Sequence, residues 1–141
     1  MYKGEPKKGI EFYNLLISSD DFTSELGKVA LASGKLEAEL IRFLQRNEIE
    51  GKYERKTLGH LVALAEKHGL LNKNMIIALK ELSKQRNYIT HNIYALFIDL
   101  IEETILEKTN LLDCDVDLYQ ERAWQLKLNL NDLADIIKEK S

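Results

Sequence analysis

The sequence predicts an all-α protein, folded as an up-and-down bundle of four to five helices. Apolar residues recur every three or four positions in several long segments, which is the spacing of one helix face. The single proline, Pro6, lies before all of these segments, and no segment shows a convincing alternation of apolar and polar residues. Short polar connections separate the segments, which favours packing between neighbouring helices.

The first part of the chain is expected to be an arm over residues 1–18, followed by a single α-helical domain over residues 19–141. Gly4, Pro6 and Gly9 are typical of an irregular segment. Residues 10–17, IEFYNLLI, are apolar and aromatic, and either a short docking helix or an extended strap is compatible with them. The sequence leaves open whether the arm docks on its own bundle or exchanges between protomers.

The first long helix is predicted within residues 18–47, with Ser19 or Asp20 as its N-cap. Gly27 and Gly34 lower its helix propensity, and we expect them to permit the close approach of a neighbouring helix. Its apolar stripe comprises Phe22, Leu26, Val29, Ala30, Ser33, Leu36 or Glu37, Leu40 and Leu44.

Two further helices are predicted in the middle of the chain. Thr57 is the expected N-cap of a short one, and Gly69 fits the left-handed residue after its end. From Asn72 or Asn74 the pattern predicts one very long helix to about residue 108, or two helices that meet near the sequence RNYITH. The apolar stripe comprises Ile76, Leu79, Leu82, Ile89, Ile93, Leu96, Leu100 and Ile101.

A turn over TNLLDCDVD is expected to lead into a final helix. The alternate aspartates Asp113, Asp115 and Asp117 lack the glycine and distal glutamate of a calcium loop, so we interpret them as helix-capping residues. Cys114 is interpreted as a small turn residue. The apolar face of the final helix comprises Leu118, Trp124 or Ala123, Leu126, Leu130, Leu133, Ile136 and Ile137.

Composition narrows the class of protein. The formal net charge of −3 argues against a protein that coats nucleic acid through bulk charge, although it allows a small basic site. A single cysteine excludes an intrachain disulfide, and no window approaches the length of a membrane span, so a cytoplasmic protein without membrane contact is expected. Without a phosphate loop, a CxxC pair or an HExxH motif, we expect no cofactor and no metal site.

Polar residues interrupt the apolar stripe of the third predicted helix around RNYITH. They comprise Ser83, Arg86, Asn87, Thr90, His91 and Tyr94, and Lys80 and Lys84 lie about one turn before them. Arg86 and His91 are about 140° apart on an ideal helix, so they would meet only if the helix bends or if a second copy is apposed. An arginine fork matches phosphate oxygens, and a histidine can transfer a proton near neutral pH.

RNYITH, preceded by a long helix and a short one, resembles the Arg-x4-6-His motif of the HEPN superfamily. The resemblance implies a dimeric helical bundle and a metal-independent endoribonuclease of toxin–antitoxin or host-defence systems, which cleaves RNA by attack of the ribose 2′-hydroxyl. It implies that Arg86 binds the scissile phosphate, that His91 is the general acid or base and that Asn87 orients the site. An antitoxin protein is a possible partner.

The remaining polar residues of the motif are expected to contact the substrate, namely Ser83, Lys84, Thr90 and Tyr94. Position 93, where some HEPN proteins carry a modified tyrosine, is isoleucine here. Two alternatives stay open: a non-catalytic module that binds a protein partner or a nucleotide, and a plain structural bundle in which His91 is buried and hydrogen-bonded.

Overall fold

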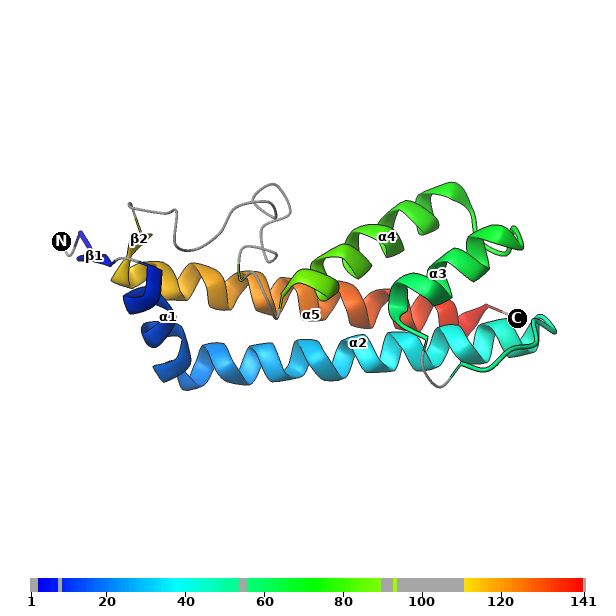
Figure 1. Cartoon of the computed structure of the whole chain (residues 1–141), viewed down its shortest axis with the longest axis horizontal. Coiled ribbons are helices and arrows are strands. Elements are labelled where there is room, and N and C mark those ends of the chain that lie inside the picture. Colours follow the sequence, from blue (N-terminus) through cyan, green and yellow to red (C-terminus); the bar gives the residue numbers. More distant parts are fainter. Residues whose placement is uncertain (1–2, 8, 54–55, 90–92, 94–110, 141) are drawn as a thin grey trace.

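The computed structural model describes residues 3–7, 9–53, 56–89, 93 and 111–140, and over these residues the protein is a helical bundle (Figure 1). The predicted fold class, an all-α bundle of four to five helices, is confirmed. The helices are α1 (Gly9–Ser18), α2 (Asp20–Arg46), α3 (Leu58–Lys67), α4 (Lys73–Tyr88) and α5 (Val116–Glu139), with the short 3-10 helix η4 (Asp113–Asp115) before α5. In the described part of the chain, none of the helices combines the length and apolar character needed to cross a membrane.

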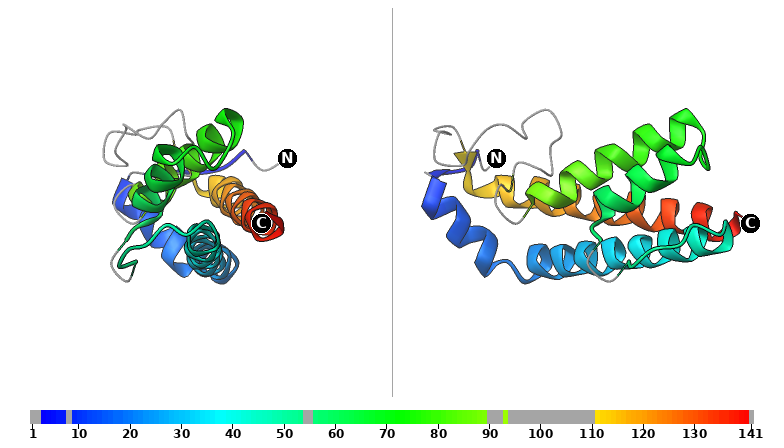
Figure 2. Two further views of the ribbon diagram at one scale, coloured as in Figure 1. Left: turned by 90° about the vertical axis from the view of Figure 1, so that its right-hand side faces the viewer. Right: turned by 45° about the vertical axis from the view of Figure 1, so that its right-hand side comes forward.

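The two longest helices, α2 and α5, lie side by side and run in the same direction (Figures 1 and 2). The hairpin of α3 and α4 covers the end of this pair that holds the C-termini of both helices, while α1 lies at the opposite end (Figure 2). Fully buried side chains on the facing sides include Leu36, Leu40 and Leu44 from α2 and Ala123, Leu130 and Ile137 from α5. The core therefore runs along the length of the α2–α5 pair.

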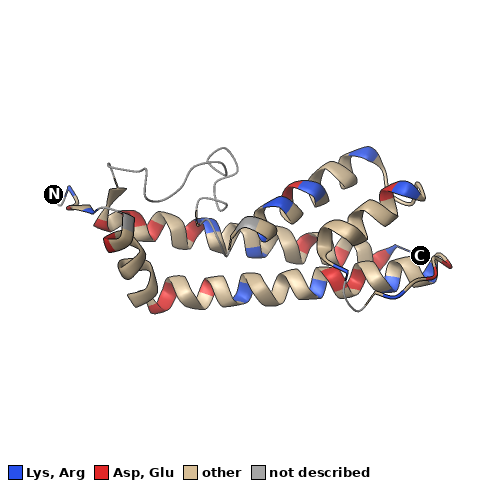
Figure 3. Cartoon of the chain, viewed as in Figure 1, with Lys and Arg blue, Asp and Glu red and all other residues tan. Residues whose placement is uncertain are grey.

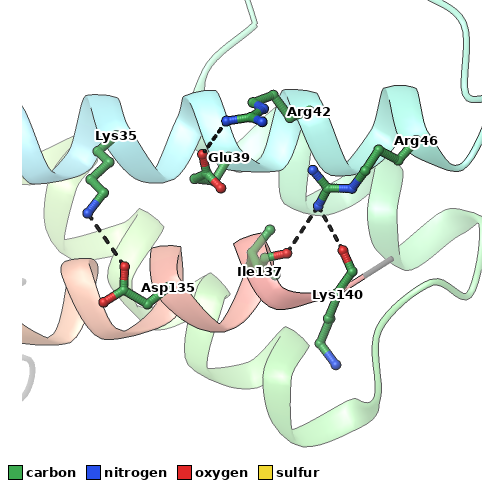
Figure 4. A network of polar contacts seen from close by, with 7 residues as sticks. All are labelled: Lys35, Glu39, Arg42, Arg46, Asp135, Ile137 and Lys140. Carbon is green, nitrogen blue, oxygen red and sulfur yellow. Dashed lines mark hydrogen bonds and ion pairs between the residues drawn. The ribbon is translucent and has the colours of Figure 1, made fainter.

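Polar contacts also connect α2 to α5 (Figure 4). Lys35 Nζ lies 3.5 Å from Asp135 Oδ1. One turn beyond the core, Arg46 Nη2 donates to the carbonyl oxygens of Ile137 at 3.2 Å and Lys140 at 2.9 Å. Arg46 thus adds side-chain hydrogen bonds to carbonyls at the C-terminal end of α5, where the Ile137 carbonyl also accepts from the Lys140 N–H.

The starts of α2, α3 and α4 and the end of α3 follow the predicted capping residues. Ser19, Thr57 and Asn72 each accept a hydrogen bond from the backbone N–H three residues further on, and so begin α2, α3 and α4. Gly69 adopts the predicted left-handed conformation after α3, with φ of 62°. After α2 the same position is held by Glu48, with φ of 61°, which the sequence pattern did not indicate.

The N-terminal arm packs on the bundle, and residues 10–17 form a helix rather than a strap. Phe12 and Leu16 are buried in the common core, and the ring of Phe12 meets that of Tyr119 edge to face at 5.0 Å. Before α1, β1 (Pro6–Lys7) pairs antiparallel with β2 (Leu111–Leu112). Strands of two residues are too short to show the alternation by which strands are recognised in a sequence.

Two expectations about packing are wrong. Gly27 and Gly34 are exposed, and among the described residues nothing lies within 4 Å of a Cβ placed at either position, so they permit no close helix approach. On α5, Leu118 and Ile136 are exposed rather than packed. The predicted extension of the third helix over residues 94–108 lies outside the described residues.

Candidate functional site

The described part of the candidate site lies at the C-terminal end of α4. Ser83, Lys84, Arg86 and Asn87 occupy the last two turns of this helix, which ends at Tyr88 within the RNYITH sequence. The other predicted site residues, Thr90, His91 and Tyr94, lie outside the described residues. The structure therefore places the arginine half of the Arg-x4-His pair.

Ser83 and Asn87 belong to the side of α4 that faces α3. Ser83 is buried, and a Cβ placed on Gly59 of α3 would lie 3.1 Å from Ser83 Oγ and 4.0 Å from Asn87 Nδ2. Gly59 thus allows α3 and α4 to approach closely beside the candidate site. The structure places Ser83 in this contact between helices, and Asn87 at its exposed edge.

Arg86 lies on another side of α4 and faces α2. Its Nε is 3.9 Å from Glu37 Oε1, and its side chain keeps 43% of its surface exposed. Among the described residues, Glu37 Oε1 is buried without a hydrogen-bond partner, so this long ion pair is the contact that compensates its charge. A half-exposed pair at this distance contributes about 0–1 kcal/mol to stability.

Arg86 also borders a cavity of about 420 Å³ between α1, α2 and the end of α4. The lining is otherwise apolar or uncharged among the described residues, and comprises Tyr13, Leu16, Ile17, Phe22, Thr23, Leu26, Val29, Ala30, Ser33, Arg86, Ile89 and Ile93. Ser33 is 3% exposed, and its Oγ has no hydrogen-bond partner within the described chain. A buried hydroxyl without a partner costs about 1–3 kcal/mol.

The exposed surface of α4 is basic, as Figure 3 shows. Lys80 Nζ forms an ion pair with Glu66 Oε2 of α3 at 2.8 Å, which offsets part of this charge. Lys84 is exposed one turn further along, close to Arg86 in the sequence. The basic surface is local, in keeping with the slightly negative net charge of the chain.

Of the aspartates interpreted as helix-capping residues, Asp115 caps the 3-10 helix η4 and not α5, whose N-cap position it holds without a side-chain cap hydrogen bond. Asp113 Oδ1 accepts from the N–H of Glu5, and Asp115 Oδ2 accepts from the N–H of Leu112, both at 2.9 Å. These bonds fix the turn before α5. Within the described residues, no group of three or more histidine, cysteine, aspartate or glutamate side chains could hold a metal ion.

Glu37 and Ser33 are site residues that the sequence pattern did not indicate. Both were placed on or beside the apolar stripe of the first long helix, where a polar residue at a core position was the available signal. Their relation to Arg86 depends on how α2 and α4 pack, which helical periodicity does not specify.

Comparisons of the chain with protein-family models, with curated proteins and with solved structures find no match. The fold and the described site define a helical bundle with an arginine at the border of an apolar cavity.

Proposed function

We propose that the protein is a HEPN-type, metal-independent endoribonuclease that acts as a homodimer in the cytoplasm, as a toxin or host-defence component. The observation that carries the proposal is the sequence RNYITH at the end of α4, preceded by a long helix and a short one. The exposure of Arg86 and Lys84 at that helix end supports it, because a scissile phosphate needs accessible cations.

In the proposed reaction, the ribose 2′-oxygen attacks the neighbouring phosphorus while the bond from phosphorus to the 5′-oxygen breaks. His91 takes the proton of the 2′-hydroxyl or delivers a proton to the 5′-oxygen, and Arg86 stabilises the charge that develops on the phosphate. Asn87 orients the site. The products are a 2′,3′-cyclic phosphate and a free 5′-hydroxyl.

A dimer would solve the problem of proton transfer with one motif histidine per chain. Acid and base together need two groups, and a twofold axis between two copies of the motif would supply two histidines and two arginines. Lys84, Ser83, Thr90 and Tyr94 are the proposed substrate contacts, and a cognate antitoxin is a proposed partner.

The test is RNA cleavage by the purified protein with EDTA present. The parent should cut RNA and leave cyclic phosphate ends, and Arg86→Ala and His91→Ala should abolish cutting while circular dichroism and oligomeric state stay unchanged. His68→Ala is the matched control, because His68 is an exposed histidine at the end of α3. Equal cleavage by the parent and both motif variants would refute the proposal.

A non-catalytic interaction module is the second candidate, and the position of Glu37 favours it. A carboxylate 3.9 Å from Arg86 Nε offsets the charge that a phosphate would meet. A protein that shifts RNA in a gel, or binds a cognate protein, but never cuts RNA would support this candidate over the first.

A further inference from the structure

The cavity beside Arg86 has the size and lining of a small-molecule site. Its volume of about 420 Å³ falls within the range of about 300–1,000 Å³ that is usual for ligand pockets. Apolar side chains from α1, α2 and the end of α4 form its walls, including Leu16, Phe22 and Val29. These walls can accept an alkyl chain or an aromatic ring without leaving a polar group unpaired.

Two polar groups distinguish this cavity from a plain apolar gap. Ser33 Oγ lines it, is almost wholly buried and has no hydrogen-bond partner among the described residues. Arg86 is the charged side chain among the described lining residues, and its contact with Glu37 runs through Nε at a long 3.9 Å. A hydroxyl that lacks an acceptor and a guanidinium with a weak partner both favour an added anion.

We propose that the cavity binds a small amphipathic anion, an alkyl or aryl carboxylate, with its apolar body among Leu16, Phe22 and Val29 and its head group on Arg86. The Ser33 hydroxyl donates a hydrogen bond to one carboxylate oxygen, and the guanidinium donates to the carboxylate. A nucleotide fits less well, because most of its polar groups would face apolar walls without partners. A cationic amphiphile would meet the charge of Arg86.

The proposal goes beyond the ribonuclease proposal and does not depend on it. Binding is measured on the full chain without RNA. A protein that binds the anion but cuts no RNA would support the anion site and refute the ribonuclease proposal. The two proposals share Arg86, while Ser33 and Ala30 belong to the cavity alone.

Isothermal titration calorimetry with three probes that share an unbranched chain of about ten carbons tests the class of ligand. Decanoate should bind with one site per chain, and 1-decanol and decyltrimethylammonium should bind at least about tenfold more weakly. The comparison uses the unaltered protein, so it does not depend on the folding of any variant. Decanoate that gives no saturable heat, or binds no better than 1-decanol, overturns the proposal.

Variants then locate the site. Arg86→Gln should weaken decanoate binding about tenfold or more, and Ser33→Ala about threefold to tenfold. Ala30→Phe, which puts a ring into the cavity from an exposed position, should abolish binding. Arg42→Gln is the matched control, since Arg42 is an exposed arginine of α2 that pairs with Glu39 (Figure 4).

The expected outcome is loss of affinity in the three cavity variants with parent-like affinity in Arg42→Gln. Unchanged affinity in both Arg86→Gln and Ala30→Phe overturns the proposal.

Discussion

The guanidinium of Arg86 and the carboxylate of Glu37 lie 3.9 Å apart and connect the end of α4 to the middle of α2. Because Glu37 Oε1 is buried and has no hydrogen bond among the described residues, the arginine is its charge partner. The same arginine borders the apolar cavity. Glu37 therefore competes with any anion that Arg86 binds.

We predict that Glu37→Gln raises the affinity for decanoate by up to about fivefold, since it removes a competing charge worth up to about 1 kcal/mol. Its effect on the free energy of unfolding should stay within about 1 kcal/mol. Calorimetry and urea denaturation measure the two quantities. Glu66→Gln is the control, because it removes a carboxylate that pairs with Lys80 instead. An equal gain in both variants would show that net charge, not the contact with Arg86, governs the affinity.

The C-terminal ends of α2 and α3 have the same backbone geometry but different residues at the left-handed position, so their contributions to stability can be compared. Ile49 N–H bonds to the Leu44 carbonyl at 2.9 Å, and Leu70 N–H bonds to the Ala65 carbonyl at 3.1 Å, so both helices end with the same left-handed turn. The left-handed residue is glutamate in the first turn and glycine in the second. A side chain in this conformation costs about 1–2 kcal/mol.

Glu48→Gly should therefore stabilise the protein by about 1 kcal/mol, and Gly69→Ala should destabilise it by a similar amount. Urea denaturation measures both changes. Glu50→Gly removes the same charge from an exposed position without a positive φ, and it should be neutral or destabilising. Stabilisation by Glu50→Gly as large as that by Glu48→Gly would contradict the backbone explanation.

The capping residues were predictable, whereas the contacts between helices were not. Ser19, Thr57, Asn72 and Gly69 act on the chain within a few residues, so a short sequence pattern contains the information. Glu48 adopts a left-handed conformation that glutamate does not favour, in a turn closed by the hydrogen bond from the Ile49 N–H to the Leu44 carbonyl. A sequence pattern that reports preferences cannot indicate an exception of this kind.

The glycines also show that a sequence pattern does not specify which residues contact another helix. Gly27, Gly34 and Gly59 look alike in the sequence, yet only Gly59 lies against another helix, at Ser83. The candidate site was predictable as a polar interruption of a helix, but the pairing of Arg86 with Glu37 depends on tertiary structure.

Because only Gly59 of the three lies against another described helix, we predict that alanine at Gly34 and alanine at Gly59 change the stability differently. Gly34→Ala should stabilise α2 by about 0.5–1 kcal/mol, because alanine restricts the unfolded chain more and nothing crowds its methyl group. Gly59→Ala should lose this gain, since its Cβ would lie 3.1 Å from Ser83 Oγ. Combining Gly59→Ala with Ser83→Ala should restore part of the gain. Additive effects of these two changes in urea denaturation would argue against a direct contact.

The Glu25–Lys127 pair gives a prediction about pH. Lys127 Nζ donates to Glu25 Oε2 at 3.0 Å between α5 and α2, and this hydrogen bond holds the pKa of Glu25 below its ordinary value. A lowered pKa in the folded state favours folding above the ordinary glutamate pKa of about 4.3, and the stabilisation is lost as the pH falls through the lowered pKa.

The difference in unfolding free energy between the parent and Glu25→Gln should be largest near neutral pH and should shrink below about pH 4.3. Urea denaturation between about pH 6 and about pH 3 measures it. Glu50→Gln, which removes a carboxylate from an exposed position, is the control. A difference for Glu25→Gln that grows as the pH falls would contradict the assignment.

The parallel pairing of α2 with α5 has a consequence for synthesis on the ribosome. The apolar side of α2 packs against α5, which is translated after α1 to α4. Leu36, Leu40 and Leu44 therefore remain without this packing until α5 has been synthesised. During that interval the apolar side of α2 is exposed on the nascent chain, where chaperones can bind it and proteases can cleave the chain. A truncated chain that ends before α5 should therefore be degraded and should not fold into the bundle.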